Sequence, residues 1–206
     1  MFNAQVIIER ENLIWEVYKF SLNLEDRVFR LRKLTVDPRY VAPPAELRER
    51  IDREAELLRV IFSIITPDWL ADGAFIWPNS GPLTAFFGDQ RLYNNRKLSF
   101  HSGLDIVARQ NEPVVASNSG RVVAASNFYF SGKLVIIDHG LGLFTTYHHL
   151  EKILVKRGQM VRKGEMIGLV GQTGLSTGPH LHWSVRLGPN RIDPLSLLAL
   201  SFPSKK

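Results

Sequence analysis

Cysteine is absent from this chain of 206 residues, so the chain forms neither disulfide bonds nor thiolate–metal bonds. Any metal ion held by its side chains must therefore be bound by histidine, aspartate or glutamate. The absence of cysteine does not by itself identify a cellular compartment.

Long apolar runs are also missing. The longest dense run, Val60 to Ile65, is far too short to span a membrane and predicts buried core instead. The first residues, MFNAQVIIERENL, carry acids early and lack the basic-then-apolar pattern of a signal peptide. Either the protein stays inside the cell, or this chain is a mature form from which a signal has been removed.

Acidic residues are the scarcer charge, because 26 Lys and Arg stand against 20 Asp and Glu, which gives a formal net charge of +6. A basic surface favours an anionic partner such as nucleic acid, anionic lipid or an anionic polymer. The basic residues are scattered, however, with only small clusters at Arg30–Lys33 and Lys156–Lys163. A solvated basic face explains this pattern, and no nucleic-acid binding is expected.

Three zones of different texture follow one another along the chain. From Met1 to about Asp37, apolar residues recur with a period of two, as in strands that bury one face. The pairs are Trp15 and Val17, Leu22 and Leu24, and Phe29 and Leu31. We expect several antiparallel strands here, forming a small accessory β region over residues 1–42.

The second zone predicts one amphipathic helix, with a linker, over residues 43–71. Pro43-Pro44 suits a helix start, where the missing N–H of proline costs nothing, and Thr66-Pro67 ends the pattern. Between them an apolar stripe has the period of a helix, at Leu47, Ile51, Leu58, Phe62 and Ile65.

The third zone, residues 72–200, is rich in glycine and short β runs, and residues 201–206 form a tail. Clusters of Gly, Asn, Asp or Ser separate the runs RVVAAS, KLVIIDHG, GLFTTYHHL, EMIGLVG and HLHWSVRL. Closely spaced short strands indicate an antiparallel sheet or a compact β sandwich, so the fold class is mainly β. All six histidines lie in this zone, and this clustering is the first chemical signal.

Two stretches place possible metal ligands close together. In FHSGLDIV, a turn running into a strand would pair His101 with Asp105, and an imidazole with a carboxylate suits zinc. Alone, this HxxxD spacing is a weak signal. In TGPHLHW, His180 and His182 share one face of a strand. Two imidazoles side by side there are costly to leave unpaired, and a metal ion resolves that cost.

The stretch TTYHHLEK differs because His148 and His149 are adjacent. In a regular strand they face opposite sides, so only one of them joins a site on a given face. Together these stretches offer more than the three protein ligands that a catalytic zinc site needs. The surplus favours a catalytic metal site over a closed structural one. The spacing does not decide which of His180 and His182 binds the metal.

These three stretches, in this order, resemble the signature motifs HxxxD, Tyr-x-His-Leu and HxH of the LytM/lysostaphin-type peptidoglycan zinc metalloendopeptidases. The likeness covers roughly residues 75–198 and includes FFGDQR, EPVVASNSGRVVAA and LVKRGQMVRKGEMIGLVGQTG. It implies an antiparallel β-sheet metallopeptidase domain with a LytM/lysostaphin-like groove over residues 72–200. The stretch FFGDQRLYNNRKLSF departs from the family's usual version, so the resemblance does not define the rim of the cleft.

Carried over residue by residue, the resemblance implies that His101, Asp105 and His182 bind Zn²⁺. It implies that His149, the histidine just before leucine in YHHL, and His180 are catalytic without being ligands. Such a pair would take the proton of the attacking water and stabilise the oxyanion, and which one is the base stays open.

Two histidines remain outside the implied site. His148 would point away from it on the opposite side of the strand, in a structural role. His139, in IDHG, corresponds to a turn residue of the fold.

The resemblance implies a zinc-dependent endopeptidase that hydrolyses peptide cross-links of peptidoglycan in the periplasm or elsewhere in the cell envelope. The accessory region resembles that of some Gram-negative members, which favours a D,D-endopeptidase acting on D-Ala–meso-diaminopimelate bonds. An alternative is a catalytically inactive relative that binds and activates other cell-wall hydrolases, with a regulatory partner protein. No membrane anchor is visible in the chain.

A carrier domain is a third hypothesis, because VKRGQMVRKGEMIG resembles the hairpin of biotinyl and lipoyl domains. A carrier needs an exposed, modifiable lysine at a tight turn. Lys163-Gly164 lies inside the hairpin without the flanking residues of that motif, so we interpret the similarity as shared β architecture.

Overall fold

The computed structural model describes residues 2–10, 14–22 and 28–202. Leu24 and residues 203–206, on which parts of the sequence prediction rest, lie outside these ranges. Within the described ranges, no helix is long and apolar enough to cross a membrane.

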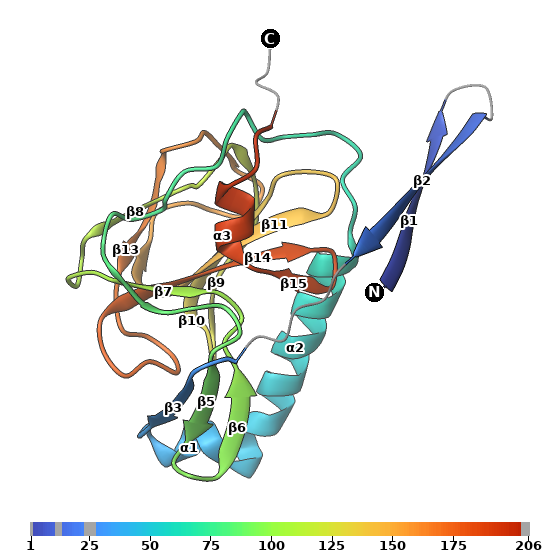
Figure 1. Ribbon diagram of the computed structural model, residues 1–206. Helices are drawn as coiled ribbons and strands as arrows, with labels where there is room; N and C mark the ends of the chain where they lie inside the picture. Colours follow the sequence, from blue (N-terminus) through green and yellow to red (C-terminus); the bar gives the residue numbers. More distant parts are fainter. Residues whose placement is uncertain (1, 11–13, 23–27, 203–206) are drawn as a thin grey trace.

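The N-terminal residues form a hairpin that stands away from the main sheet (Figure 1). Its strands β1 (Phe2–Arg10) and β2 (Ile14–Leu22) pair antiparallel, which confirms that part of the prediction. Strand β3 (Leu31–Leu34) is different, because it runs parallel to β5 (Gln90–Tyr93), which in turn pairs antiparallel with β6 (Lys97–Phe100). The prediction that residues 31–34 belong to an antiparallel unit is therefore wrong. Since this pairing crosses residue 42, the division of the chain into domains stays a prediction.

The helical zone contains α1 (Pro38–Val41), the 3₁₀ turn η1 (Ala45–Leu47) and the long helix α2 (Arg48–Ser63). Of the dense apolar run 60–65, Ile61 and Phe62 are buried. The Phe62 ring meets Phe144 edge to face at 5.4 Å between ring centroids. Ile65 follows the helix end and is 70% exposed, so the prediction that it belongs to the buried stripe is wrong.

The C-terminal part forms a sheet of ten strands, in which each pair runs antiparallel. The main path of the sheet is β12-β9-β10-β11-β14-β7-β4, with β13 beside β11 and β8, and β15 beside β14. This sheet confirms the mainly β prediction.

The elements of this C-terminal part are β4 (Leu83–Ala85), β7 (Leu104–Val107), β8 (Pro113–Val115), β9 (Gly120–Phe128), β10 (Gly132–Asp138), β11 (Leu143–Ile153), β12 (Met160–Val161), β13 (Met166–Val170), β14 (His180–Leu187), β15 (Asn190–Ile192) and α3 (Pro194–Leu198).

The two faces of strand β14 differ, because one packs in the hydrophobic core and the other carries polar side chains. Three of its four odd-numbered residues are apolar and fully buried in the main core, namely Leu181, Trp183 and Val185, whereas Leu187 at the strand end is 50% exposed. Because side chains alternate along a strand, the even-numbered polar residues lie on the other face. That face carries His180 and His182, and the candidate site is built on it.

Candidate metal centre

The three expected metal ligands come from two neighbouring strands and the loop before one of them. Asp105 on β7 and His182 on β14 are direct cross-strand partners, so their side chains share one face of the sheet. His101 lies just before β7. Gly103 allows the close approach of this turn, because a Cβ there would lie 2.3 Å from the carbonyl oxygen of Trp183.

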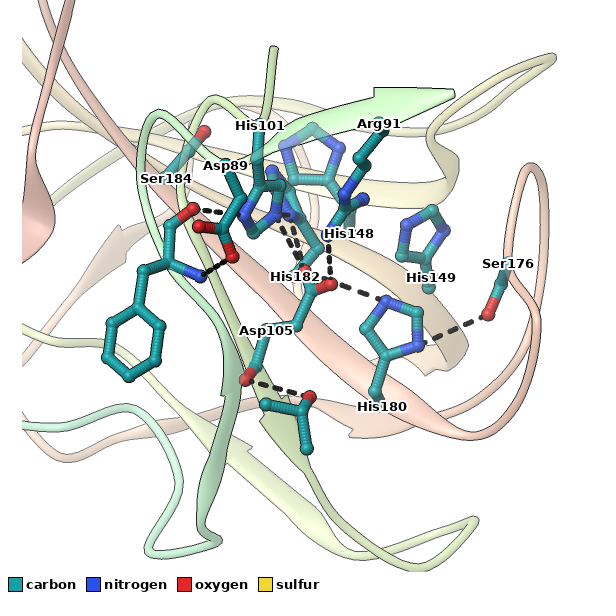
Figure 2. Close-up of polar contacts among 12 residues, drawn as sticks. Asp89, Arg91, His101, Asp105, His148, His149, Ser176, His180, His182 and Ser184 are labelled. Atoms are coloured by element: carbon teal, nitrogen blue, oxygen red, sulfur yellow. Dashed lines mark hydrogen bonds and ion pairs between the residues drawn. The ribbon is translucent and has the colours of Figure 1, made fainter. Parts of the chain in front are cut away.

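The donor atoms of these residues converge at one buried point (Figure 2). His101 Nε2 lies 2.9 Å from Asp105 Oδ1 and 2.9 Å from His182 Nδ1, and His182 Nδ1 lies 2.8 Å from Asp105 Oδ1. The fold therefore brings together the three side chains that the sequence indicated as ligands.

The chemistry of this donor set fits a cation. His101 donates its Nδ1 proton to the carbonyl oxygen of Phe86 at 2.8 Å, so its Nε2 presents a lone pair when the ring is neutral. Burial lowers the pKa of His182 to about 3, which keeps the His182 ring neutral. A single proton can satisfy one of the three contacts but not all of them. Two imidazoles and one carboxylate around an open point form a ligand set that Zn²⁺ accepts.

Asp105 also has a partner that the motif analysis did not reveal. Arg91 on β5 donates Nη2–H to Asp105 Oδ2, which leaves Oδ1 facing the two imidazoles. Burial by itself would raise the pKa of Asp105, but contacts with His101 and His182 outweigh it and hold the pKa below its ordinary value. Arg91 thus fixes the orientation of a carboxylate that stays ionised.

His149 reaches the site through a break in the regular strand. The pairing of β10 with β11 shifts register between Lys133 and Val135, and His149 has φ of 60°, a backbone region uncommon for residues other than glycine. Such a β-bulge turns a side chain toward the other face. The His149 ring accordingly lies 4.9 Å from that of His180 between ring centroids.

The two histidines beside the donor cluster, His149 and His180, have similar hydrogen bonds. His149 Nδ1 donates to the carbonyl oxygen of Thr173 at 2.7 Å, and His180 Nδ1 donates to that of Gly178 at 2.8 Å. Each ring therefore keeps its Nε2 for other partners, and His180 Nε2 lies 3.7 Å from Asp105 Oδ1. Burial lowers the pKa of His149 to about 3.

The position of His148 corrects the sequence prediction that it points away. Its ring lies 4.8 Å from that of His182 between ring centroids, and its Nε2 lies 2.7 Å from Thr146 Oγ1. Thr146 Oγ1 also contacts Ser184 Oγ at 2.6 Å. Because the bulge at His149 breaks the alternation, both adjacent histidines lie at the site, His148 against the ring of His182 and His149 beside His180.

His139 lies in a different environment. Its Nδ1 donates to the carbonyl oxygen of Ser119 at 2.8 Å, and its Nε2 lies 2.8 Å from Thr145 Oγ1 on the core side of the sheet. Burial lowers its pKa to about 4. The prediction that His139 stays outside the metal cluster agrees with this geometry.

A cavity of about 300 Å³ opens beside the donor cluster. Asp105 and His180 line it from the main sheet, and Ser176 lines it from the loop before β14. Strand β3 contributes Arg32, and β5 contributes Arg91. The cavity and the candidate metal centre therefore adjoin each other.

The geometry has counterparts among known proteins. The profile of peptidase family M23 matches residues 99–194. The chain is 37% identical over 128 residues to the peptidoglycan DD-endopeptidase ShyA of Vibrio cholerae, a match that covers 60% of this chain and 30% of that protein. This chain thus spans less than a third of the length of that relative.

Solved structures give the same family. A structure described as a peptidase M23 of Pseudomonas aeruginosa has a TM-score of 0.75 and 30% identity, covering 95% of this chain and 73% of that one. A zinc-containing peptidase of Vibrio cholerae has a TM-score of 0.57 and 31% identity, covering 64% of this chain and 41% of that one. With its HxxxD and HxH residues converging on one buried point, the chain belongs to peptidase family M23, the LytM/lysostaphin-type family that its motifs resemble.

Proposed function

We propose that this protein is a zinc-dependent endopeptidase that hydrolyses peptide cross-links of peptidoglycan. The observation that carries the proposal is the convergence of His101, Asp105 and His182 next to two imidazoles that are not part of the donor set. A catalytic zinc site needs three protein ligands with an open position, and proton-transfer groups beside it. The three donors beside two further imidazoles, with Asp105 and His180 lining an open cavity, support this proposal.

His101 Nε2, Asp105 Oδ1 and His182 Nδ1 are the atoms that would hold the metal. Zinc bound there supplies a Lewis acid and lowers the pKa of water toward neutrality. Arg91 keeps Asp105 Oδ2 occupied, so that Oδ1 stays available.

His149 and His180 would handle the protons of the reaction. Each donates Nδ1–H to a backbone carbonyl oxygen, so each neutral ring can accept a proton from water at Nε2. The ring that carries the extra proton can then donate it to the oxyanion or to the leaving amine. The two rings lie 4.9 Å apart between centroids, close enough to act on the same bond.

The substrate part of the proposal rests on the relatives. ShyA of Vibrio cholerae is named as a peptidoglycan DD-endopeptidase, which supports cleavage of D-Ala–meso-diaminopimelate cross-links by this chain. With such a substrate, we expect the protein to act in the periplasm or elsewhere in the cell envelope. The complete donor set favours an active enzyme over the inactive regulator of other hydrolases, because a regulator has no need of metal ligands.

The carrier hypothesis receives no support from the position of Lys163. Its ammonium donates to the carbonyl oxygens of Asp72 at 2.6 Å and Ala74 at 3.3 Å. A lysine held in this way is not presented for modification.

Digestion of defined cross-linked muropeptides tests the proposal. The zinc-loaded protein should convert peptide dimers into monomers whose masses identify the D-Ala–meso-diaminopimelate bond, and a chelator should stop the reaction until zinc is restored. The control is the His182→Ala variant treated in the same way. Intact dimers after incubation with protein that holds stoichiometric zinc would overturn the proposal and favour the regulatory alternative.

A further inference from the structure

Strand β3 of the N-terminal segment forms part of the cavity beside the metal centre. Its parallel pairing with β5 places Arg32 directly across from Arg91. Both arginines line the same cavity as His180. A residue far from the three motifs in sequence therefore lies beside the residues proposed to carry out the chemistry.

The two arginines differ in how fully their charges are paired. Arg91 donates to Asp105, and its side chain is 14% exposed. The Arg32 side chain is 34% exposed, and its Nε forms an ion pair with Asp89 Oδ2 at 3.4 Å without making a hydrogen bond. Asp89 Oδ2 already accepts the backbone N–H of Phe86 at 3.1 Å.

The balance of charge in the cavity favours an anion. Its lining contains the cationic side chains of Arg32 and Arg91 but one carboxylate, that of Asp105, within the described part of the chain. The carboxylate is already shared by Arg91 and the metal-ligand rings. A cation bound at the donor cluster would make the cavity more positive still.

We propose that Arg32 binds a free carboxylate of the peptide substrate, next to the bond that is cleaved. This inference rests on the proposed function for the identity of that bond. The planar guanidinium matches a carboxylate with two parallel hydrogen bonds, and Arg32 lies partly exposed at the cavity, where a ligand can reach it. The substrate class is therefore a peptide that carries an anionic group beside the scissile amide, and the N-terminal segment supplies specificity.

Two pairs of ligands and two variants test the inference. The first pair are cross-linked peptide dimers that differ only in a free carboxylate or a carboxamide next to the scissile bond. The second pair are the same molecules with an uncleavable ethylene link in place of the scissile amide, used to measure affinity without turnover. Both pairs are offered to the zinc-loaded full chain, to Arg32→Gln and to Lys33→Gln.

Lys33→Gln is the matched control, because it removes one positive charge from the exposed face of the same strand. The wild type and the control should prefer the carboxylate over the carboxamide by at least about tenfold, in affinity and in kcat/KM. Arg32→Gln should weaken carboxylate binding by about tenfold to a hundredfold, mainly through KM. It should leave binding of the carboxamide ligand nearly unaffected, with unchanged zinc content.

Affinity and turnover separate this inference from the proposed function. Equal wild-type affinity for the two uncleavable ligands would overturn the inference, as would a preference that survives in Arg32→Gln. A carboxylate preference that depends on Arg32, in a zinc-loaded protein that cleaves neither dimer, would support the subsite and overturn the proposed hydrolysis.

Discussion

Both faces of strands β11 and β14 bury polar groups, but the two faces differ in how those groups are paired. On the core face, His139, Thr145 and Tyr147 form a chain of hydrogen bonds that ends at Ser117. On the other face, imidazole nitrogens of His101 and His182 meet each other and a carboxylate at 2.8–2.9 Å. The first arrangement supplies partners for its polar groups, and the second leaves lone pairs facing one point.

This difference indicates which buried histidines are suited to bind a metal. Burial alone does not, because His139 is fully buried and its two ring nitrogens both have protein partners. What distinguishes His101 is that one nitrogen is fixed by a backbone carbonyl while the other faces a second imidazole. The sequence zone that contains all six histidines therefore includes histidines from two unrelated environments.

The largest expected effect comes from replacing, one at a time, the two histidines of TGPHLHW. His182→Ala should lose stoichiometric zinc and turnover together, because it removes one of three protein ligands. His180→Ala should keep its zinc and lose kcat by a factor of at least about 10². Zinc content by atomic emission, measured beside the cleavage rate, separates the two outcomes.

The control for this pair is circular dichroism of both variants, which should match the wild type. Zinc loss in His180→Ala together with zinc retention in His182→Ala would reverse the ligand assignment. It would also remove the distinction drawn between the ligand rings and the rings beside them.

A smaller effect is expected on the core face, where pH acts through His139. Its pKa is about 4 in the folded protein against an ordinary 6.5, so between these values the unfolded chain binds more protons than the folded one. The contribution of His139 to the free energy of unfolding should therefore be fully present above pH 6.5. It should fall by about 3 kcal/mol as the pH decreases to 4. Urea unfolding of the wild type and of His139→Gln across this range measures the difference.

His139→Gln should be less stable at pH 7 and should have a shallower pH dependence. Both proteins carry the same metal centre, so the pH dependence of that centre cancels in the comparison. Parallel curves for the two proteins would contradict a neutral, buried role for His139.

The sequence predicted those parts of the site that depend on local spacing. The i, i+2 separation of His180 and His182 places both on one face of any strand, whatever its neighbours. The separation of His101 and Asp105 across Gly103 needed only a short turn before β7. The order of the motifs then assigned the ligands through the resemblance, and the structure brings these residues together.

The parts that sequence reasoning missed depend on pairing between distant segments. The bulge that brings His149 beside His180 leaves no glycine or proline as a signal in TTYHHLEK. Because the sequence prediction assumed regular alternation, it placed His148 on the face away from the site. The parallel partner of β3 and the contact of Arg91 with Asp105 follow from how β5 lies against its neighbours, and no local pattern encodes either.

The smallest predicted effect concerns Arg91, whose contact with Asp105 sharpens the contrast between the two faces. Arg91→Gln removes the cation that holds Asp105 Oδ2, so Asp105 loses its fixed orientation while the three donors remain. Loss of such a supporting contact typically lowers metal affinity by about 10- to 100-fold. Competition with a zinc-binding dye measures that affinity directly.

A positioning role for Arg91 predicts a further result that a purely structural role does not predict. Since Arg91 acts through Asp105, excess zinc should restore much of the turnover lost in Arg91→Gln, and Arg91→Lys should fall between the variant and the wild type. Arg96→Gln, on the exposed turn of the same β5–β6 hairpin, is the matched control and should bind zinc as the wild type does. Unchanged zinc affinity in Arg91→Gln would mean that the two imidazoles alone orient the carboxylate, as the hydrogen bonds of the core face orient His139.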